Sequence, residues 1–142
     1  SSSAASDVYK RQSIKGMHIL LAEDNELNME IAEFVLQNEG AVVTKAWNGQ
    51  EAVERFKKSE PGEFDAILMD IMMPVMNGYE AAKTIRSMDR KDAKAIPIIA
   101  MTANAFTEDR IRAKEAGMDQ HIAKPIDIKT ILAVFDQVFR TS

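Results

Sequence analysis

The sequence predicts an α/β fold in which five parallel strands alternate with five helices. Short apolar runs alternate along the chain with longer segments whose apolar residues recur at helical spacing. No two predicted strands are joined by a tight hairpin sequence, so helical crossovers connect them and the sheet is parallel. Right-handed crossovers place helices on both faces of such a sheet, which makes it a doubly wound, three-layer sandwich.

Length and composition limit the class of protein. The chain has 142 residues, of which 46% are hydrophobic and 28% charged, as expected of one soluble globular domain. The net charge of −4 is spread along the chain without a basic run, which argues against nucleic-acid binding by this segment. The absence of cysteine excludes disulfides and thiol catalysis. The apolar runs are far shorter than the roughly 20 residues that span a bilayer, and no secretory signal is visible. We therefore expect a cytoplasmic domain without membrane contact in this segment.

The amino-terminal segment differs in composition from the rest. Residues 1–14 begin with SSSAASDVYKRQS, which has little apolar content and no periodicity. We expect them to form a disordered tail or linker. Residues 15–142 are expected to form the domain.

The first strand and helix carry clear local signals. The apolar run Met17–Ala22 predicts a buried strand, with His18 as a packed or strand-end residue. Asn25 or Asp24 is suited to cap the following helix, and Gly40 is suited to end it. The apolar residues that recur at helical spacing are Leu27, Ile31, Phe34 and Val35.

The remaining elements follow from apolar runs, caps and breakers. In chain order they are strand Ala41–Ala46, a helix with a capping box of Asn48 and Glu51 that ends before Pro61, strand Ala66–Asp70, helix Gly78–Met88, a charged loop Asp89–Lys94, strand Ile96–Met101, a helix from Asn104 or Thr107 to Ala116, strand Gln120–Ala123, and a helix capped by Asp127.

Polar side chains end four of the predicted strands. Glu23 and Asp24 follow the first strand, Asp70 ends the third, Thr102 the fourth, and Lys124 the fifth. Because the carboxyl ends of parallel strands lie at one edge of a sheet, these residues converge on one pocket. Three carboxylates in one pocket repel one another. A hard cation relieves that repulsion, and Mg²⁺ suits an all-oxygen site that also accepts phosphate oxygens.

The same set of groups suits phosphoryl transfer to a carboxylate. Lys124 offers a compact positive charge to Asp70 or to an anion bound beside it. Thr102 offers a hydroxyl donor to an oxygen of that anion. Transfer of a phosphoryl group to Asp70 needs positioning and charge neutralisation, which these groups and a metal provide. The alternative is that these side chains only cap helices and form ion pairs.

Four segments carry a family resemblance. LLAEDN, ILMDIMMPVMNGYE, PIIAMTA and HIAKPID resemble the signatures of response-regulator receiver domains, most of all those attached to hybrid sensor histidine kinases. The resemblance covers about Lys15 to Arg140. It implies a flavodoxin-like (βα)5 sandwich with strand order 2-1-3-4-5.

The resemblance implies a role for each site residue. Asp70 would accept a phosphoryl group from a phosphohistidine on a histidine kinase dimerisation domain or a histidine phosphotransfer domain. Thr102 and Lys124 would bind the phosphoryl oxygens, and their movement would couple the site to the face made by the fourth helix, fifth strand and fifth helix. The Lys124–Pro125 bond would be cis. The Mg²⁺ ligands would be Asp24 and Asp70 directly, Glu23 through water, and the backbone carbonyl of Met72.

Two positions depart from the commonest family pattern. The acidic pair is Glu23-Asp24 instead of Asp-Asp, which a water-mediated outer ligand tolerates. His121 stands where many members carry a Tyr or Phe switch, so it is either a switch or a partly exposed residue of an edge strand.

Met72 and Asn104 flank the site at positions that influence hydrolysis of the phosphoryl group in this family.

The predicted function is a phosphoaccepting signalling switch of a two-component system or phosphorelay. It would catalyse its own phosphorylation and dephosphorylation without turning over an external substrate, and in a chain fused to a kinase it would be part of a hybrid histidine kinase. One alternative is a degenerate receiver that acts only as an interaction module. A haloacid-dehalogenase-type phosphatase is disfavoured because Met72 stands where a second acid is needed. A flavodoxin is disfavoured because no phosphate-binding loop follows the first strand.

Overall fold

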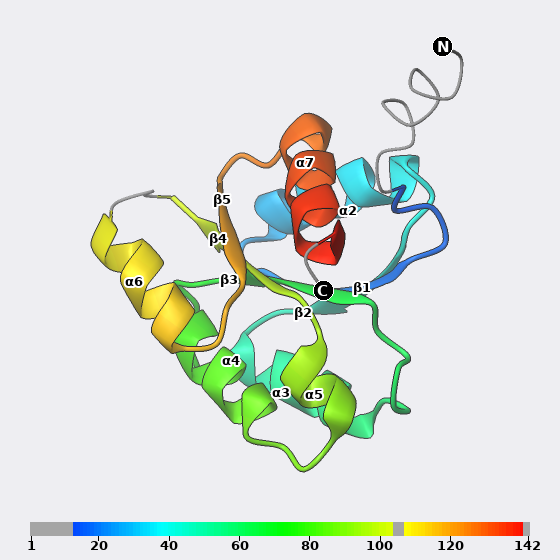
Figure 1. Cartoon of the computed structure of the whole chain (residues 1–142). Helices are drawn as coiled ribbons and strands as arrows, with labels where there is room; N and C mark the ends of the chain where they lie inside the picture. The colour runs from blue at the N-terminus through cyan, green and yellow to red at the C-terminus, as the bar shows by residue number, and fades with distance from the viewer. Residues whose placement is uncertain (1–12, 104–106, 141–142) are drawn as a thin grey trace.

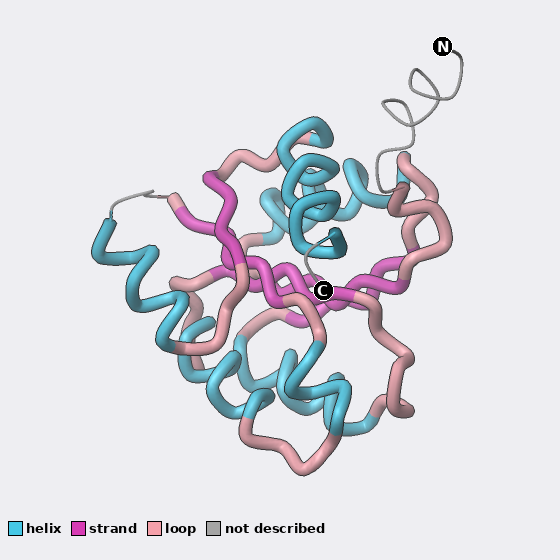
Figure 2. Tube along the Cα trace, viewed as in Figure 1, coloured by secondary structure: helices cyan, strands magenta, loops and turns pink. Residues whose placement is uncertain are grey.

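A five-stranded parallel sheet forms the middle layer of the molecule (Figures 1 and 2). The structure, a computed structural model, describes residues 13–103 and 107–140. The strand order is β2-β1-β3-β4-β5, which confirms the predicted fold and topology. The strands are β1 (His18–Ala22), β2 (Val42–Ala46), β3 (Ala66–Asp70), β4 (Ile98–Thr102) and β5 (Gln120–Ala123).

Helices cover both faces of the sheet. Helices α2 and α7 lie over one face, and α3, α4, α5 and α6 lie over the other (Figure 1). Every residue of β3 and β4 is buried, because both faces of these central strands are covered. The helices in the described part of the chain are α2 (Glu26–Asn38), α3 (Gly49–Lys58), α4 (Gly78–Arg86), α5 (Lys91–Ala95), α6 (Thr107–Glu115) and α7 (Ile128–Arg140).

The folded domain begins close to the predicted boundary between residues 14 and 15. Ile14, which the prediction assigned to the tail, is 1% exposed and packs with the core under α2 and α7. His18 is a packed residue, as predicted: its ring lies 4.6 Å from that of Phe64, and its Nε2 lies 2.6 Å from Thr44 Oγ1. Most of the predicted tail, residues 1–12, lies outside the described residues.

Side-chain caps fix where the helices begin. Asn25 accepts a hydrogen bond from the backbone N–H of Asn28, which confirms Asn25 as the cap of α2. Asn48 caps α3 in the same way through the N–H of Glu51. The predicted capping box is wrong in one detail, because the Glu51 carboxylate accepts from the N–H of Trp47 and not from that of Asn48.

Most of the apolar residues whose spacing predicted helix α2 do not face the sheet. Leu27, Ile31 and Phe34 are 63%, 40% and 70% exposed. The residues that face the sheet are Met29, Ala32 and Leu36, which are spaced equally well for a helix. Two apolar faces therefore share one helix, and apolar periodicity alone does not say which one the sheet covers. Of the four apolar residues whose spacing predicted the helix, only Val35 packs against the core.

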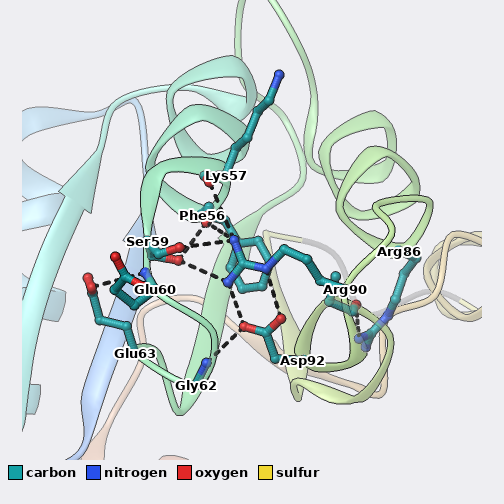
Figure 3. A network of polar contacts seen from close by, with 10 residues as sticks. Phe56, Lys57, Ser59, Glu60, Gly62, Glu63, Arg86, Arg90 and Asp92 are labelled. Atoms are coloured by element: carbon teal, nitrogen blue, oxygen red, sulfur yellow. Dashed lines mark hydrogen bonds and ion pairs between the residues drawn. The ribbon is translucent and has the colours of Figure 1, made fainter.

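The segment predicted as a charged loop contains the short helix α5. Arg90 precedes this helix, and its guanidinium donates to both carboxylate oxygens of Asp92 at 2.9 and 2.7 Å. The same guanidinium donates to the carbonyls of Phe56 and Ser59 at the end of α3, and it lies 4.6 Å above the Phe56 ring (Figure 3). Asp92 also accepts from the N–H of Gly62. This network ties the segment to the carboxyl end of α3, which sequence periodicity does not reveal.

We expect Arg90→Ala to lower the free energy of unfolding by about 2 kcal/mol, because it leaves several partly buried carbonyl and carboxylate groups without their donor. Urea unfolding measures the change. Arg90→Lys should restore little of the loss, since an ammonium cannot make the same planar set of bonds. Full recovery with lysine would show that charge alone matters there.

Candidate functional site

Three carboxylates lie together at the carboxyl edge of the sheet. Glu23 and Asp24 directly follow β1, and Asp70 is the last residue of β3. One carboxylate oxygen from each lies within 4.8 Å of the others. Glu23 and Asp70 are buried, with 1% and 3% of their surface exposed, whereas Asp24 is exposed. The cluster therefore has two buried members and one at its rim.

Lys124 reaches this cluster from the end of β5. Its Nζ donates to Glu23 Oε2 at 3.0 Å and lies 3.1 Å from Asp70 Oδ2. The peptide bond between Lys124 and Pro125 is cis. Glu23 also accepts a hydrogen bond from the N–H of Asn25 through Oε1. Lys124 thus bridges two buried carboxylates with one positive charge.

The environment shifts the protonation of Asp70 and Lys124. Burial, with the nearby charge of Glu23, raises the pKa of Asp70 to about 6, although Lys124 opposes the shift. Burial lowers the pKa of Lys124, but its bonds to Glu23 and Asp70 outweigh that effect and raise its pKa overall. Ionised Asp70 is therefore costly in this pocket, and an added cation would stabilise it.

The loop after β3 fixes the backbone of Asp70. Gly78, the first residue of α4, packs against the carbonyl of Asp70 and donates its N–H to the carbonyl of Ile71. A β-carbon at position 78 would collide with the Asp70 carbonyl oxygen. Asn77 and Glu80 form a reciprocal capping box that holds the start of α4. The glycine is therefore needed for close approach of two backbones.

We expect Gly78→Ala to lower the free energy of unfolding by about 2 kcal/mol, because α4 must move away from β3 to admit the methyl group. Gly62→Ala is an instructive comparison, since a β-carbon there meets no atom and only the positive φ of 81° is strained. Thermal unfolding measures both. If Gly78→Ala destabilises the fold less than Gly62→Ala does, the packing explanation is wrong.

Comparison with known proteins identifies the domain. Residues 19–136 match the response regulator receiver domain family. The chain belongs to this family. It is 34% identical to Histidine kinase 1 of Arabidopsis thaliana over 93% of the chain, and 40% identical to Hybrid signal transduction histidine kinase M of Dictyostelium discoideum over 84% of the chain. The chain spans only 13% and 5% of the length of these two kinases.

Solved receiver domains have the same fold. The receiver domain of sensor histidine kinase PA1611 from Pseudomonas aeruginosa PAO1, with a magnesium ion coordinated in its active site cleft, is 36% identical with a TM-score of 0.77. That similarity covers 88% of this chain and 98% of the other. The receiver domain of Ssk1 from Saccharomyces cerevisiae, crystallised with the histidine phosphotransfer protein Ypd1, is 30% identical with a TM-score of 0.74 over 84% of this chain and 86% of the other.

The donor set of this receiver domain fits a magnesium ion. Glu23, Asp24 and Asp70 offer carboxylate oxygens close enough to share one ion, and hard oxygen ligands are those that Mg²⁺ prefers. Burial and the nearby charge of Glu23 raise the pKa of Asp70, so a cation bound here would favour the ionised form of Asp70. The ligand role of the Met72 carbonyl stays a prediction.

A groove of about 220 Å³ opens beside the buried Thr102 of the receiver domain. Met72, 79% exposed, stands at its rim. Tyr79 of α4 and Arg112 of α6 form a further wall, with the guanidinium carbon 4.5 Å from the ring centre. No sequence pattern links Tyr79 and Arg112, so this contact between α4 and α6 could not be predicted from the sequence.

His121 lies on the edge strand β5 and is partly buried. Burial, with Arg110 nearby, lowers the pKa of His121. The alternative of a partly exposed edge-strand residue therefore describes its position, while its switch role stays a prediction. Asn104 lies outside the described residues. Within the part of the chain that the structure describes, no helix has the length and apolarity to cross a membrane.

Proposed function

We propose that this receiver domain accepts a phosphoryl group on Asp70 from a phosphohistidine of a partner protein, with Mg²⁺ as cofactor. The observation that carries the proposal is the environment of Asp70. It is a buried carboxylate at a strand end, with Lys124 3.1 Å away and two further carboxylates in the same pocket. A structural ion pair does not need a second and third carboxylate beside it, whereas a metal-assisted acceptor does.

In the transfer step one O–P bond forms and one P–N bond breaks. A lone pair on a carboxylate oxygen of Asp70 attacks phosphorus as the P–N bond of the phosphohistidine breaks, and the electrons of that bond return to the imidazole nitrogen. Asp70 must be ionised to attack, which is the form that its surroundings disfavour. Lys124 compensates for the charge on Asp70 before transfer, and it is positioned to contact a phosphoryl oxygen afterwards. Thr102 would donate its hydroxyl to another oxygen.

Glu23, Asp24 and Asp70 are the side chains that would hold Mg²⁺. When bound, the ion supplies positive charge to the phosphoryl oxygens and relieves the repulsion within the cluster. The backbone carbonyl of Met72 would complete the protein ligands. Glu23 would reach the ion through water, an arrangement that tolerates Glu in place of Asp.

Similar proteins suggest which partner proteins to propose for this domain. The chain resembles segments of hybrid histidine kinases and the receiver domain of Ssk1, which was crystallised with the phosphotransfer protein Ypd1. We therefore propose a phosphorelay in the cytoplasm, with a kinase dimerisation domain or a histidine phosphotransfer domain as partner. A change at Thr102 and Lys124 would reach the surface made by α6, β5 and α7, since β4 leads to α6 and β5 to α7.

Intact-mass measurement after incubation with acetyl phosphate and Mg²⁺ tests the proposal. We expect the wild-type chain to gain the mass of one phosphoryl group, and we expect no gain with EDTA. Lys58→Ala, which removes an exposed cation on α3, should be phosphorylated like wild type. A wild-type chain that gains no mass from acetyl phosphate or from a phosphorylated phosphotransfer protein would favour a module that only binds partners.

A further inference from the structure

Met72 is the most exposed methionine of the chain. The sequence contains nine methionines, and the structure describes all of them. Met72 is 79% exposed, whereas every other methionine is half-buried or buried. The half-buried ones are Met17, Met76 and Met88, and the buried ones are Met29, Met69, Met73, Met101 and Met118. Because a thioether must contact the oxidant to react, an oxidant in solution reaches Met72 before the others.

The exposed thioether stands beside the reactive carboxylate. Met72 follows Asp70 by two residues and, together with Thr102, lines the groove of about 220 Å³ described above. Its two neighbours in sequence, Ile71 and Met73, are buried, so the backbone that carries Met72 is anchored on both sides. A chemical change on this one side chain therefore alters the edge of the phosphorylation site without disturbing the core.

We propose that Met72 is an oxidation site through which a hydroperoxide shortens the lifetime of phosphorylated Asp70. The proposal rests on the function proposed above. With hydrogen peroxide, a lone pair of the Met72 sulfur attacks one peroxide oxygen as the O–O bond breaks. That oxygen stays on sulfur as a sulfoxide, and the other leaves as water with both peroxide protons. The sulfur is oxidised by two electrons and the peroxide is reduced by two.

Oxidation changes how residue 72 interacts with water. A thioether sulfur is a weak hydrogen-bond acceptor, whereas oxidation makes the side chain polar and adds an oxygen that accepts hydrogen bonds. Because Asp70 is 3% exposed, water reaches a phosphoryl group on it from the open side of the pocket, where Met72 stands. A sulfoxide oxygen there can accept a hydrogen bond from that water and hold it for attack.

The accelerated step is hydrolysis of the aspartyl phosphate. The water oxygen attacks phosphorus as the bond between phosphorus and the Asp70 oxygen breaks. The electrons of that bond return to the Asp70 carboxylate, and inorganic phosphate leaves with the protons of the water. The Met72 sulfoxide acts only by positioning the water, so it is regenerated unchanged in each turnover.

Peptide mass mapping after limited treatment with hydrogen peroxide tests the oxidation step. We expect Met72 sulfoxide to form about tenfold faster than sulfoxide at any other methionine, because reactivity follows exposure. Met88→Leu removes a half-buried methionine just beyond the far end of α4, and it should leave the rate at Met72 unchanged. Methionine sulfoxide reductases should reverse the modification.

Loss of the phosphoryl group, followed by intact mass after acetyl phosphate is removed, tests the effect on hydrolysis. Oxidised wild type should lose the group about threefold faster than untreated wild type, and reductase treatment should restore the slower rate. Peroxide should not change the rate of Met72→Leu relative to its own untreated sample. Met72→Gln, which carries an amide oxygen without any oxidation, should hydrolyse faster than Met72→Leu. Thermal unfolding of each sample checks that the fold is retained.

Three results would overturn the proposal. The first is oxidation of Met72 no faster than that of the half-buried Met17 or Met76. The second is hydrolysis that is unchanged or slower after oxidation of Met72. The third is equal acceleration by peroxide in wild type and in Met72→Leu, which would assign the effect to another methionine. An untreated chain that no donor phosphorylates would refute the function proposed above, and this proposal with it, even if Met72 is oxidised first.

Discussion

Asp70→Asn should abolish phosphorylation by acetyl phosphate and, without divalent metal at pH 8, raise the free energy of unfolding by about 2 kcal/mol. The two effects have one cause. The carboxylate that reacts is also the group that the metal-free pocket tolerates least, since burial and Glu23 raise the pKa of Asp70 from 3.8 to about 6. Asparagine removes that charge at the cost of its ion pair with Lys124.

The contribution of Asp70 to the stability of the folded state falls as pH rises. An acid whose pKa is raised by folding stabilises the folded state below pH 3.8, and this contribution is lost as pH rises through 6. The wild-type chain should therefore lose stability relative to Asp70→Asn between pH 5 and pH 8, by roughly 1 kcal/mol. Urea unfolding of both chains in EDTA measures the difference.

Added Mg²⁺ supplies the internal control. It should stabilise wild type more than Asp70→Asn, because binding to the folded cluster adds to the stability of the folded state. A variant that is less stable than wild type at pH 8 in EDTA would mean that the ion pair with Lys124 outweighs the burial of Asp70.

Lys124→Ala should slow phosphorylation by acetyl phosphate by about a hundredfold and lower the free energy of unfolding by about 3 kcal/mol. Lys124 Nζ lies 3.0 Å from Glu23 Oε2 and 3.1 Å from Asp70 Oδ2, and both carboxylates are almost wholly buried. Without the ammonium they face each other unpaired. The reaction also loses the positive charge positioned beside the attacking oxygen.

Stopped phosphorylation reactions analysed by intact mass, together with urea unfolding in EDTA, measure both effects. Lys58→Ala on α3 controls for loss of one positive charge and should change neither quantity appreciably. Mg²⁺ should recover part of the stability of Lys124→Ala but not its rate. Normal phosphorylation of Lys124→Ala would show that the lysine only supports the fold.

The sequence was sufficient for the sheet and for the convergence of the site. Strand β3 occurs at the predicted residues, because a strand buried on both faces reads as a continuous apolar run. The edge strand β5 also occurs at the predicted residues. Parallel strands bring their carboxyl ends to one edge, so Glu23, Asp70 and Lys124 meet although they are far apart in the chain.

Contacts between distant elements could not be predicted in the same way. The apolar residues of α2 lie on two faces, and only packing on the sheet decides that Leu36 is buried and Phe34 exposed. Arg90, which precedes helix α5, donates to the carbonyls of Phe56 and Ser59, which lie 34 and 31 residues away in sequence. The contact of Arg112 with Tyr79 likewise joins two helices. Local periodicity carries no information on such pairs.

Locating the phosphoryl group tests the central claim most directly. After phosphorylation with acetyl phosphate and Mg²⁺, borohydride reduction converts an acyl phosphate to a stable alcohol that peptide mass mapping can locate. The environment of Asp70 predicts that the reduced residue is at position 70 and at neither Glu23 nor Asp24. A reduced residue at position 23 or 24, or a phosphoryl group on a hydroxyl side chain, would contradict this account of the site.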